Sequence, residues 1–243
     1  MGFLYEHWYL TLFQVAMIVH WVRARPEFYW LWIIILLGPL GSLVYFVIEV
    51  LPGIRWKLPA IERLERRRRK EQLERIVADS PTQDSLAQLA RICAVEGERQ
   101  RAVELYGEAV RRDPHDPEAL FGRGQALLAL GKPAEAVRDL QTVVGIEPTH
   151  SFYQAAVSLA EAHAANGEIE KAEQTYRSIL GRTTVSAAYY GYARLLADRG
   201  ERDEARRQLQ QILDKQPGLP RYLRRQERPW VRKAKAMLKE LPA

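Results

Sequence analysis

The sequence predicts an all-α protein: an N-terminal transmembrane helical hairpin, a charged linker helix, and a four-repeat α-solenoid closed by a C-terminal capping helix. Three observations lead to this prediction. Residues 1–54 are strongly apolar, residues 55–82 are rich in charged side chains, and residues 83–219 repeat one pattern of glycine, alanine and proline four times. A repeat of about 34 residues indicates a stack of similar helical units. The remaining residues, 220–243, are basic and follow the last unit.

The hairpin prediction depends on two apolar segments. Residues 28–50 contain a single charged residue, Glu49, and as one helix they would span about 34 Å, enough for a hydrocarbon core of about 30 Å. Residues 3–22 have a similar length but include polar side chains. They form either a second transmembrane helix or an amphipathic helix in the interface. The uncharged centre, LTLFQVAMIV, favours the hairpin.

Basic residues set the predicted orientation. The loop between the two segments carries Arg23 and Arg25, whereas a larger basic cluster follows the second segment. Because cytoplasmic flanks carry the excess of lysine and arginine, we expect an inner-membrane protein with its repeats in the cytoplasm. The members of the larger cluster are Arg55, Lys57, Arg63, Arg66, Arg67, Arg68, Arg69 and Lys70.

The apolar segment contains an unusual Gly-Pro-Leu-Gly break. Residues 5–54 resemble the two-helix module at the N-terminus of bacterial cardiolipin synthases and related phospholipase D-like proteins. Pro39 removes a helix hydrogen bond, which favours a packing kink over a lipid-binding role. None of the five histidines is followed two places later by lysine, as phospholipase D-like catalysis requires, so lipid synthesis is not implied. The matching residues are Arg25, Trp30, Gly38, Pro39, Gly41 and Tyr45.

Residues 55–82 read as a basic juxtamembrane linker helix. Opposite charges recur four residues apart, as in Glu65 and Arg69, a spacing that stabilises helices. The arginine run interrupts the apolar positions, so a charged spacer is favoured over a continuous coiled coil. Pairwise oligomerisation through this segment is the alternative.

The repeats begin at residue 83. Four glycines recur at intervals of 34, 36 and 33 residues, alanines follow each glycine by five places, and prolines close three of the four units. This pattern resembles the tetratricopeptide repeat family, whose unit is a pair of antiparallel helices. The resemblance implies units at about 83–116, 117–150, 153–185 and 186–219. The glycines are Gly97, Gly131, Gly167 and Gly200, and the alanines are Ala102, Ala136, Ala172 and Ala205.

Each repeated position has a packing role. The glycine suits the turn between the two helices, and the alanine lets the second helix approach the first closely. Larger residues fill the groove between units, namely Tyr106, Leu140, Tyr176 and Leu209. Arg123 departs from the large apolar residue expected at its position, so we expect the local packing there to differ from that of the other units. Residues 220–243 should cap the last unit, with Pro229 in the first helical turn.

The resemblance also implies a function. Binding in this family uses the concave surface lined by the first helix of each unit, which predicts a non-enzymatic scaffold for protein or peptide partners at the membrane, without cofactor or metal. The alternative is an accessory or regulatory subunit of a membrane lipid or cell-envelope enzyme. The Lys/Asn pattern that clamps a terminal carboxylate is missing. The candidate groove residues are Arg91, Phe121, Gln125, Glu161, Tyr190 and Arg194.

The net charge of +6 lies in residues 216–243. It forms either a solvated face or a surface attracted to the lipid bilayer and its anionic headgroups. A nucleic-acid partner is not expected, because no aromatic-interleaved basic motif accompanies the charge. Cys93, the one cysteine, excludes an intramolecular disulfide and is interpreted as a small buried filler. Candidate headgroup contacts are Arg66, Arg67, Arg68, Arg69, Lys70, Arg224, Arg225 and Arg232.

Overall fold

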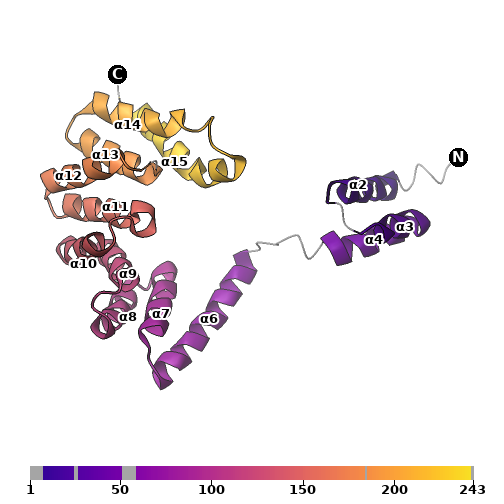
Figure 1. Cartoon of the computed structure of the whole chain (residues 1–243), viewed down its shortest axis with the longest axis horizontal. Coiled ribbons are helices and arrows are strands. Elements are labelled where there is room, and N and C mark those ends of the chain that lie inside the picture. Colours follow the sequence, from indigo (N-terminus) through magenta and orange to yellow (C-terminus); the bar gives the residue numbers. More distant parts are fainter. Residues whose placement is uncertain (1–7, 25–26, 51–58, 184, 242–243) are drawn as a thin grey trace. The chain divides into compact units, whose positions relative to one another are not determined.

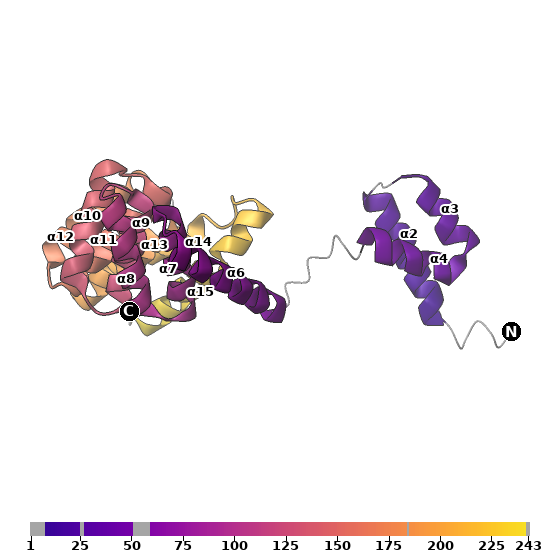
Figure 2. The ribbon, with the colours of Figure 1, turned by 90° about the horizontal axis from the view of Figure 1, so that it is seen from below.

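The computed structural model describes residues 8–24, 27–50, 59–183 and 185–241, and the chain divides into two compact units, residues 1–64 and 65–243 (Figures 1 and 2). All regular secondary structure in the described residues is helical. The all-α prediction is therefore confirmed for this part of the chain.

Over the described residues 8–24 and 27–50, the first unit folds as three short α-helices and a π-helical turn. These elements are α2 (Trp8–Ala24), α3 (Tyr29–Leu36), α4 (Gly38–Tyr45) and η1 (Phe46–Val50). Gly38 has a φ of 57°, a left-handed conformation that follows the end of α3 and lets the chain turn. A Cβ at Gly41 would lie 2.0 Å from the carbonyl oxygen of Ile33, so α4 returns closely against α3.

This break contradicts the predicted transmembrane hairpin. Helix α2 has 17 residues, and α3 and α4 have eight each. In the described ranges no helix has both the length and the apolar character needed to cross a bilayer. The prediction of spanning helices at about 3–22 and 28–50 is therefore wrong, and so is the inner-membrane location with cytoplasmic repeats. Residues 3–7 of the first predicted helix lie outside the described residues.

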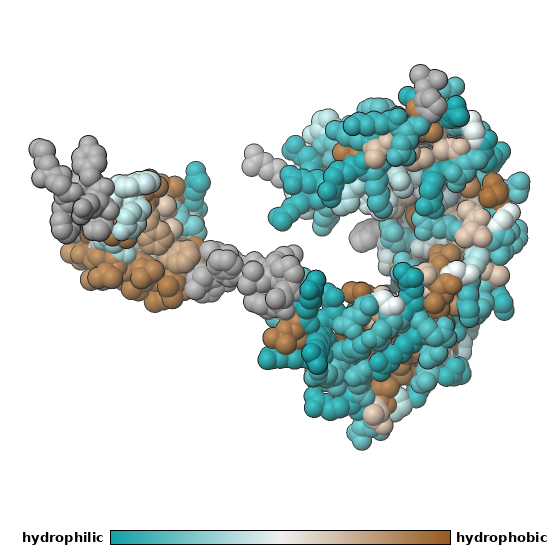
Figure 3. All heavy atoms as spheres, turned by 180° about the vertical axis from the view of Figure 1, so that it is seen from behind, coloured by the Kyte–Doolittle hydropathy of each residue, from teal (hydrophilic) through white to brown (hydrophobic). Residues whose placement is uncertain are grey.

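The first unit has a small aromatic core and a large apolar surface. Trp30, Ile34 and Tyr45 are buried, and the Tyr45 hydroxyl lies 3.0 Å from Nδ1 of His20. The Gln14 amide donates a 3.1 Å hydrogen bond to the Ile34 carbonyl. Many other large apolar side chains are exposed, and brown spheres gather on the lower part of this unit in Figure 3.

The second unit is an array of antiparallel helical pairs. Each helix contacts the next along the chain from α7 to α15, and α7, α9, α11, α13 and α15 also contact one another in that order. The first helix of each pair therefore forms a common face, here called the first-helix face. The helices are α6 (Pro59–Asp79), α7 (Gln83–Glu96), α8 (Arg99–Arg112), α9 (Pro117–Ala129), α10 (Pro133–Ile146), α11 (His150–Ala165), α12 (Ile169–Leu180), α13 (Ser186–Asp198), α14 (Arg202–Asp214) and α15 (Arg221–Glu240). The predicted domain and unit limits remain a proposal.

The glycines close the turns within the pairs, as predicted. Their φ angles are 85°, 74°, 81° and 80°, which only glycine adopts without strain. The following residue then donates its N–H to the carbonyl five residues back, as Glu98 does to Cys93 at 2.9 Å. This bond satisfies an otherwise unpaired carbonyl at the helix end.

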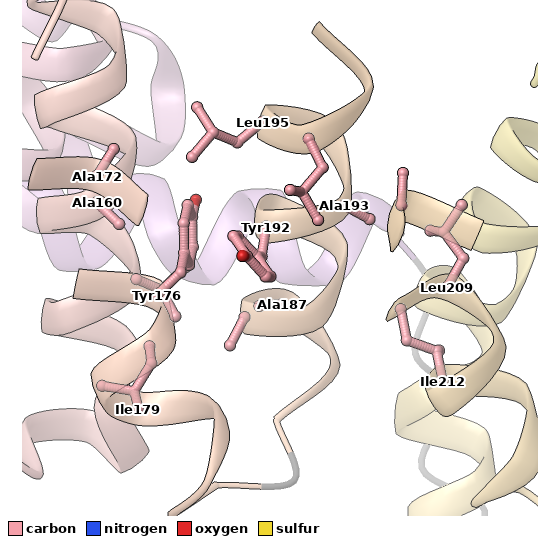
Figure 4. Close-up of a cluster of buried hydrophobic side chains, with 14 of the residues drawn as sticks. Ala160, Ala172, Tyr176, Ile179, Ala187, Tyr192, Ala193, Leu195, Leu209 and Ile212 are labelled. Carbon is pink, nitrogen blue, oxygen red and sulfur yellow. The ribbon is translucent and has the colours of Figure 1, made fainter. Parts of the chain in front are cut away.

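The repeated alanines and the large groove residues are all buried, which confirms their predicted packing roles. Figure 4 shows Tyr176 of α12 beside Tyr192 of α13, with ring centroids 5.9 Å apart. Tyr176 occupies space left by Gly191, where a Cβ would lie 2.4 Å from the tyrosine hydroxyl oxygen. Tyr106 uses Gly122 in the same way, at 2.3 Å from its Cζ. Each of these two tyrosines therefore requires glycine in the next pair.

Arg123 is accommodated at this position by an ion pair. Its Nε and Nη2 donate hydrogen bonds of 2.7 and 2.6 Å to the two carboxylate oxygens of Asp139 on α10. The Asp139 side chain is 9% exposed. The corresponding positions of the first pair hold Leu89 and Leu105, so a polar pair replaces an apolar one.

The two ends of the array are covered by α6 and α15. Lys70 of α6 forms ion pairs of 2.8 Å with Glu96 and 2.5 Å with Glu98, at the turn between α7 and α8. Ala234 of α15 is fully buried, and Trp230 packs against the same apolar core. Helix α15 begins at Arg221 and contains Pro229 in its interior, so the prediction that Pro229 lies in the first helical turn is wrong.

Candidate binding face

The first-helix face contains an open cavity between α7 and α9. Its volume is about 420 Å³, and Tyr106 of α8 contributes to its wall. Three of the predicted groove residues, Arg91, Phe121 and Gln125, meet here. The other lining residues are Ala94, Val95, Arg99, Tyr106, Glu118, Gly122, Ala126 and Ala129.

This cavity combines apolar surface with unpaired positive charge. Val95 is 62% exposed, although it is a large apolar residue. Arg91 and Arg99 line the same cavity, and within the described residues neither guanidinium makes a hydrogen bond or an ion pair. Burial raises the pKa of Tyr106 to about 12, so its phenol remains neutral at the wall.

On the α9 side of the cavity, the side chain of Phe121 packs against His150, which is itself held by nearby carboxylates. The ring of Phe121 meets the ring of His150 edge-on, with centroids 5.2 Å apart. His150 is buried, and its Nδ1 lies 2.8 Å from a carboxylate oxygen of Glu147. Its Nε2 has no hydrogen-bond partner in the described residues and lies 3.8 Å from Glu118. These contacts fix Phe121 in place while leaving part of its ring open to the cavity.

The other three predicted groove residues lie further along the face. Glu161 is on α11, and Tyr190 and Arg194 are on α13. Burial raises the pKa of the Glu161 carboxyl above its usual value, against the opposing effect of the positive charges of Arg194 and Lys233. Lys233 lies 4.5 Å from the ring centroid of Trp230, whose ring is 5.8 Å from that of Tyr190. The structure therefore separates the six candidates into two groups.

Sequence reasoning missed several residues of both groups. Val95 follows Arg91 by four places and shares its helix face, so the helical spacing could have indicated it. Arg99 comes from the first turn of α8 and reaches the cavity only because the glycine turn brings α8 back. Trp230 and Lys233 were placed in the basic C-terminal segment that caps the array, and their position beside Tyr190 was not predictable because it depends on how α15 packs.

Four of the predicted headgroup contacts make polar contacts within the fold, namely Arg67, Arg69, Lys70 and Arg224. Besides the two ion pairs of Lys70, Arg69 donates a 2.7 Å hydrogen bond to Gln88, and Arg67 pairs with Glu71 at 3.2 Å. Arg224 donates to the Leu219 carbonyl at 2.8 Å. The remaining candidates, all at least partly exposed, are Arg66, Arg68, Arg225 and Arg232. Lipid headgroups or a bilayer as partners are not supported.

A second cavity, of about 270 Å³, lies between α8, α9 and α10 and includes the Arg123–Asp139 pair. Its three guanidinium groups are matched by three carboxylates, so its lining carries no net charge. Among the described residues, no three His, Cys, Asp or Glu side chains are placed to hold a metal ion.

Comparisons with known protein families find matches in the repeat region of the chain. A family model described as tetratricopeptide repeat matches residues 88–151 and 159–220, more than half of the chain, and a second such model matches residues 127–189. None of these matches supports the predicted likeness of residues 5–54 to the cardiolipin synthase module.

One curated relative is the tetratricopeptide repeat and J domain-containing co-chaperone DNJ1 of Fusarium oxysporum f. sp. lycopersici. It is 32% identical over 114 residues, which are 47% of this chain and 21% of that protein. The chain spans less than a third of the length of the curated relatives it matches.

Solved structures share the fold. TTC0263, a thermophilic TPR protein of Thermus thermophilus, is 24% identical, with a TM-score of 0.54 over 70% of this chain and 89% of that one. YrrB, described as a TPR protein with an unusual peptide-binding site, is 18% identical, with a TM-score of 0.54 over 69% and 86%. The repeat spacing, the helical pairs and the family match agree: this chain belongs to the tetratricopeptide repeat family.

Proposed function

We propose that the chain is a non-enzymatic adaptor whose first-helix face binds a peptide segment of a protein partner. Tetratricopeptide repeat proteins mediate protein–protein interaction and scaffolding, and they are generally non-enzymatic adaptors. YrrB, which shares the fold, is described as having a peptide-binding site.

One observation carries the proposal. The cavity between α7 and α9 is open, and it exposes Val95 and part of Phe121 beside two guanidinium groups without hydrogen-bond partners in the described residues. Arginine and aromatic side chains dominate the energetics of protein interfaces. An extended segment laid across this cavity would bury the apolar side chains and pair the charges. The alternative, an accessory subunit acting through a membrane hairpin, loses its basis because the predicted spanning helices are not present in the described residues.

The test is a selection of random peptides displayed on phage against the immobilised full chain. Gln125 is exposed inside the cavity, so Gln125→Trp fills the binding space without disturbing the core. We expect this variant to lose most selected peptides. Gln210→Trp makes the same change at an exposed site on α14, outside the cavity, and should keep them. Equal recovery of peptides on both variants would contradict binding at this face.

A further inference from the structure

The α7–α9 cavity has an apolar floor that is wide enough for a large side chain. Apart from Arg91, Arg99 and Glu118, every lining residue is uncharged. Val95 and Phe121 present apolar surface to this space. The small lining residues leave the space open because their side chains are too short to fill it; they are Ala94, Gly122, Ala126 and Ala129. An apolar side chain of a partner would remove this surface from water, which is the main favourable contribution to association.

The charged groups around this apolar floor do not balance, because two are positive and one is negative. Arg91 is on α7 and Arg99 begins α8, so both positive groups come from the first helical pair. The single carboxylate, Glu118, is on α9, where the buried ring of His150 lies 3.8 Å from it. A carboxylate arriving beside the two guanidinium groups could accept paired, charge-assisted hydrogen bonds, which are among the strongest in proteins.

The other polar sites of the array lack this feature. In the cavity between α8, α9 and α10, Arg123 already donates both hydrogen bonds to Asp139, and the lining charges cancel. In the group around Glu161, the positive charges of Arg194 and Lys233 act on that carboxylate, and Lys233 also lies 4.5 Å from the ring centroid of Trp230. Among these sites, the cavity beside Val95 and Phe121 is the one lined by two guanidinium groups that make no hydrogen bond or ion pair within the described residues.

We propose that this cavity selects partner segments in which an apolar side chain is flanked within a few residues by aspartate or glutamate. The apolar side chain lies against Val95 and Phe121, and the carboxylate pairs with Arg91 and Arg99. The inference rests on the proposed peptide-binding function and adds the chemical class of the partner. Internal acidic–apolar segments satisfy it, and a free C-terminus is not required.

The composition of the displayed peptides tests this inference with the full chain as target. Peptides recovered on the wild-type chain should contain acidic residues near an apolar residue, and exchanging these acidic residues for lysine should weaken binding about tenfold. Arg91→Glu should reverse the preference, so that lysine and arginine are enriched next to the apolar residue. Arg138→Glu changes the net charge equally but lines the other cavity, and should leave the acidic preference intact.

The outcomes separate this inference from the proposed function. Peptides that are lost on Gln125→Trp but show no acidic preference, or whose preference survives Arg91→Glu, would overturn the inference and leave peptide binding standing. Loss of the acidic preference on Arg138→Glu would place the acidic segment in the α8–α10 cavity and also overturn it. Peptides unaffected by Gln125→Trp would remove the proposed function itself.

Discussion

Replacing Gly122 by alanine tests whether the tyrosine between adjacent helical pairs requires glycine. A Cβ at this position would lie 2.3 Å from Cζ of Tyr106, and Tyr106 is 5% exposed, so its ring has little room to retreat. Adding a methyl group to a packed core costs about 1–3 kcal/mol. Alanine in a helix is favoured over glycine by about 0.8–1 kcal/mol, which offsets only part of this cost.

Gly107 supplies the matched control. It lies in the middle of α8, and the nearest atoms to its added Cβ would be 3.9 Å away. Gly107→Ala should therefore stabilise the array by about 0.5–1 kcal/mol through helix propensity alone. The difference in unfolding free energy between the two alanine variants isolates the clash, and we expect about 1–3 kcal/mol.

The assay is urea unfolding of the full chain followed by circular dichroism in the far ultraviolet. Combining Gly122→Ala with Tyr106→Leu should recover most of the loss caused by the clash, because the shorter side chain vacates the space. If Gly122→Ala were as stable as Gly107→Ala, the reasoning from the Tyr106 contact would be refuted. An equal loss with and without Tyr106→Leu would also contradict it.

Three further predictions follow from the polar and buried groups. Arg123→Leu leaves the carboxylate of Asp139 buried without a partner and should lower the free energy of unfolding in urea by about 3 kcal/mol. Combining Arg123→Leu with Asp139→Leu gives an apolar pair like that of α7 and α8 and should lie near wild type. A double variant as unstable as the single one would contradict this. The hydrogen bond from Lys70 holds the pKa of Glu98 below its usual value. The pair therefore stabilises the fold fully at pH values above the usual glutamate pKa of about 4.3. This contribution is lost as the pH falls through the lowered pKa of Glu98. Lys70→Met should therefore reduce the loss of thermal stability between about pH 6 and pH 3, and an unchanged pH profile would count against the pair. Burial raises the pKa of Cys93 to about 11, so iodoacetamide should label the thiol at about pH 8 only after unfolding in urea, and rapid labelling of the native chain would disprove its burial.

The repeats were predictable because several positions recur together. The turn glycines, the buried alanines and the large groove residues each have a single packing role, and the structure shows the same roles. The partner of Arg123 was not predictable, since Asp139 lies 16 residues later and is brought near only by the antiparallel turn. Lys70 was counted as free charge for a similar reason, because Glu96 is 26 residues away along the chain.

The N-terminal prediction failed for a different reason. Hydropathy measures how apolar a segment is, but it does not report where the segment bends. Residues 28–50 are apolar enough to suggest one helix, yet the left-handed backbone at Gly38 divides them. In the candidate site, the first-helix positions identified Arg91, Phe121 and Gln125, whereas Arg99 and Lys233 depended on how neighbouring helices pack.

The contact of Tyr106 with Gly122, and of Tyr176 with Gly191, has a consequence for how such an array can change over time. The matching position of the third pair is Ser158, after a pair whose second helix carries Leu140 in place of tyrosine. Each junction is thus specific for its own neighbour. Deleting the second pair would set Tyr106 against Ser158, and duplicating the third pair would set Tyr176 against Ser158. The array is therefore expected to tolerate a rearrangement only when each tyrosine is inherited together with the glycine of the following pair.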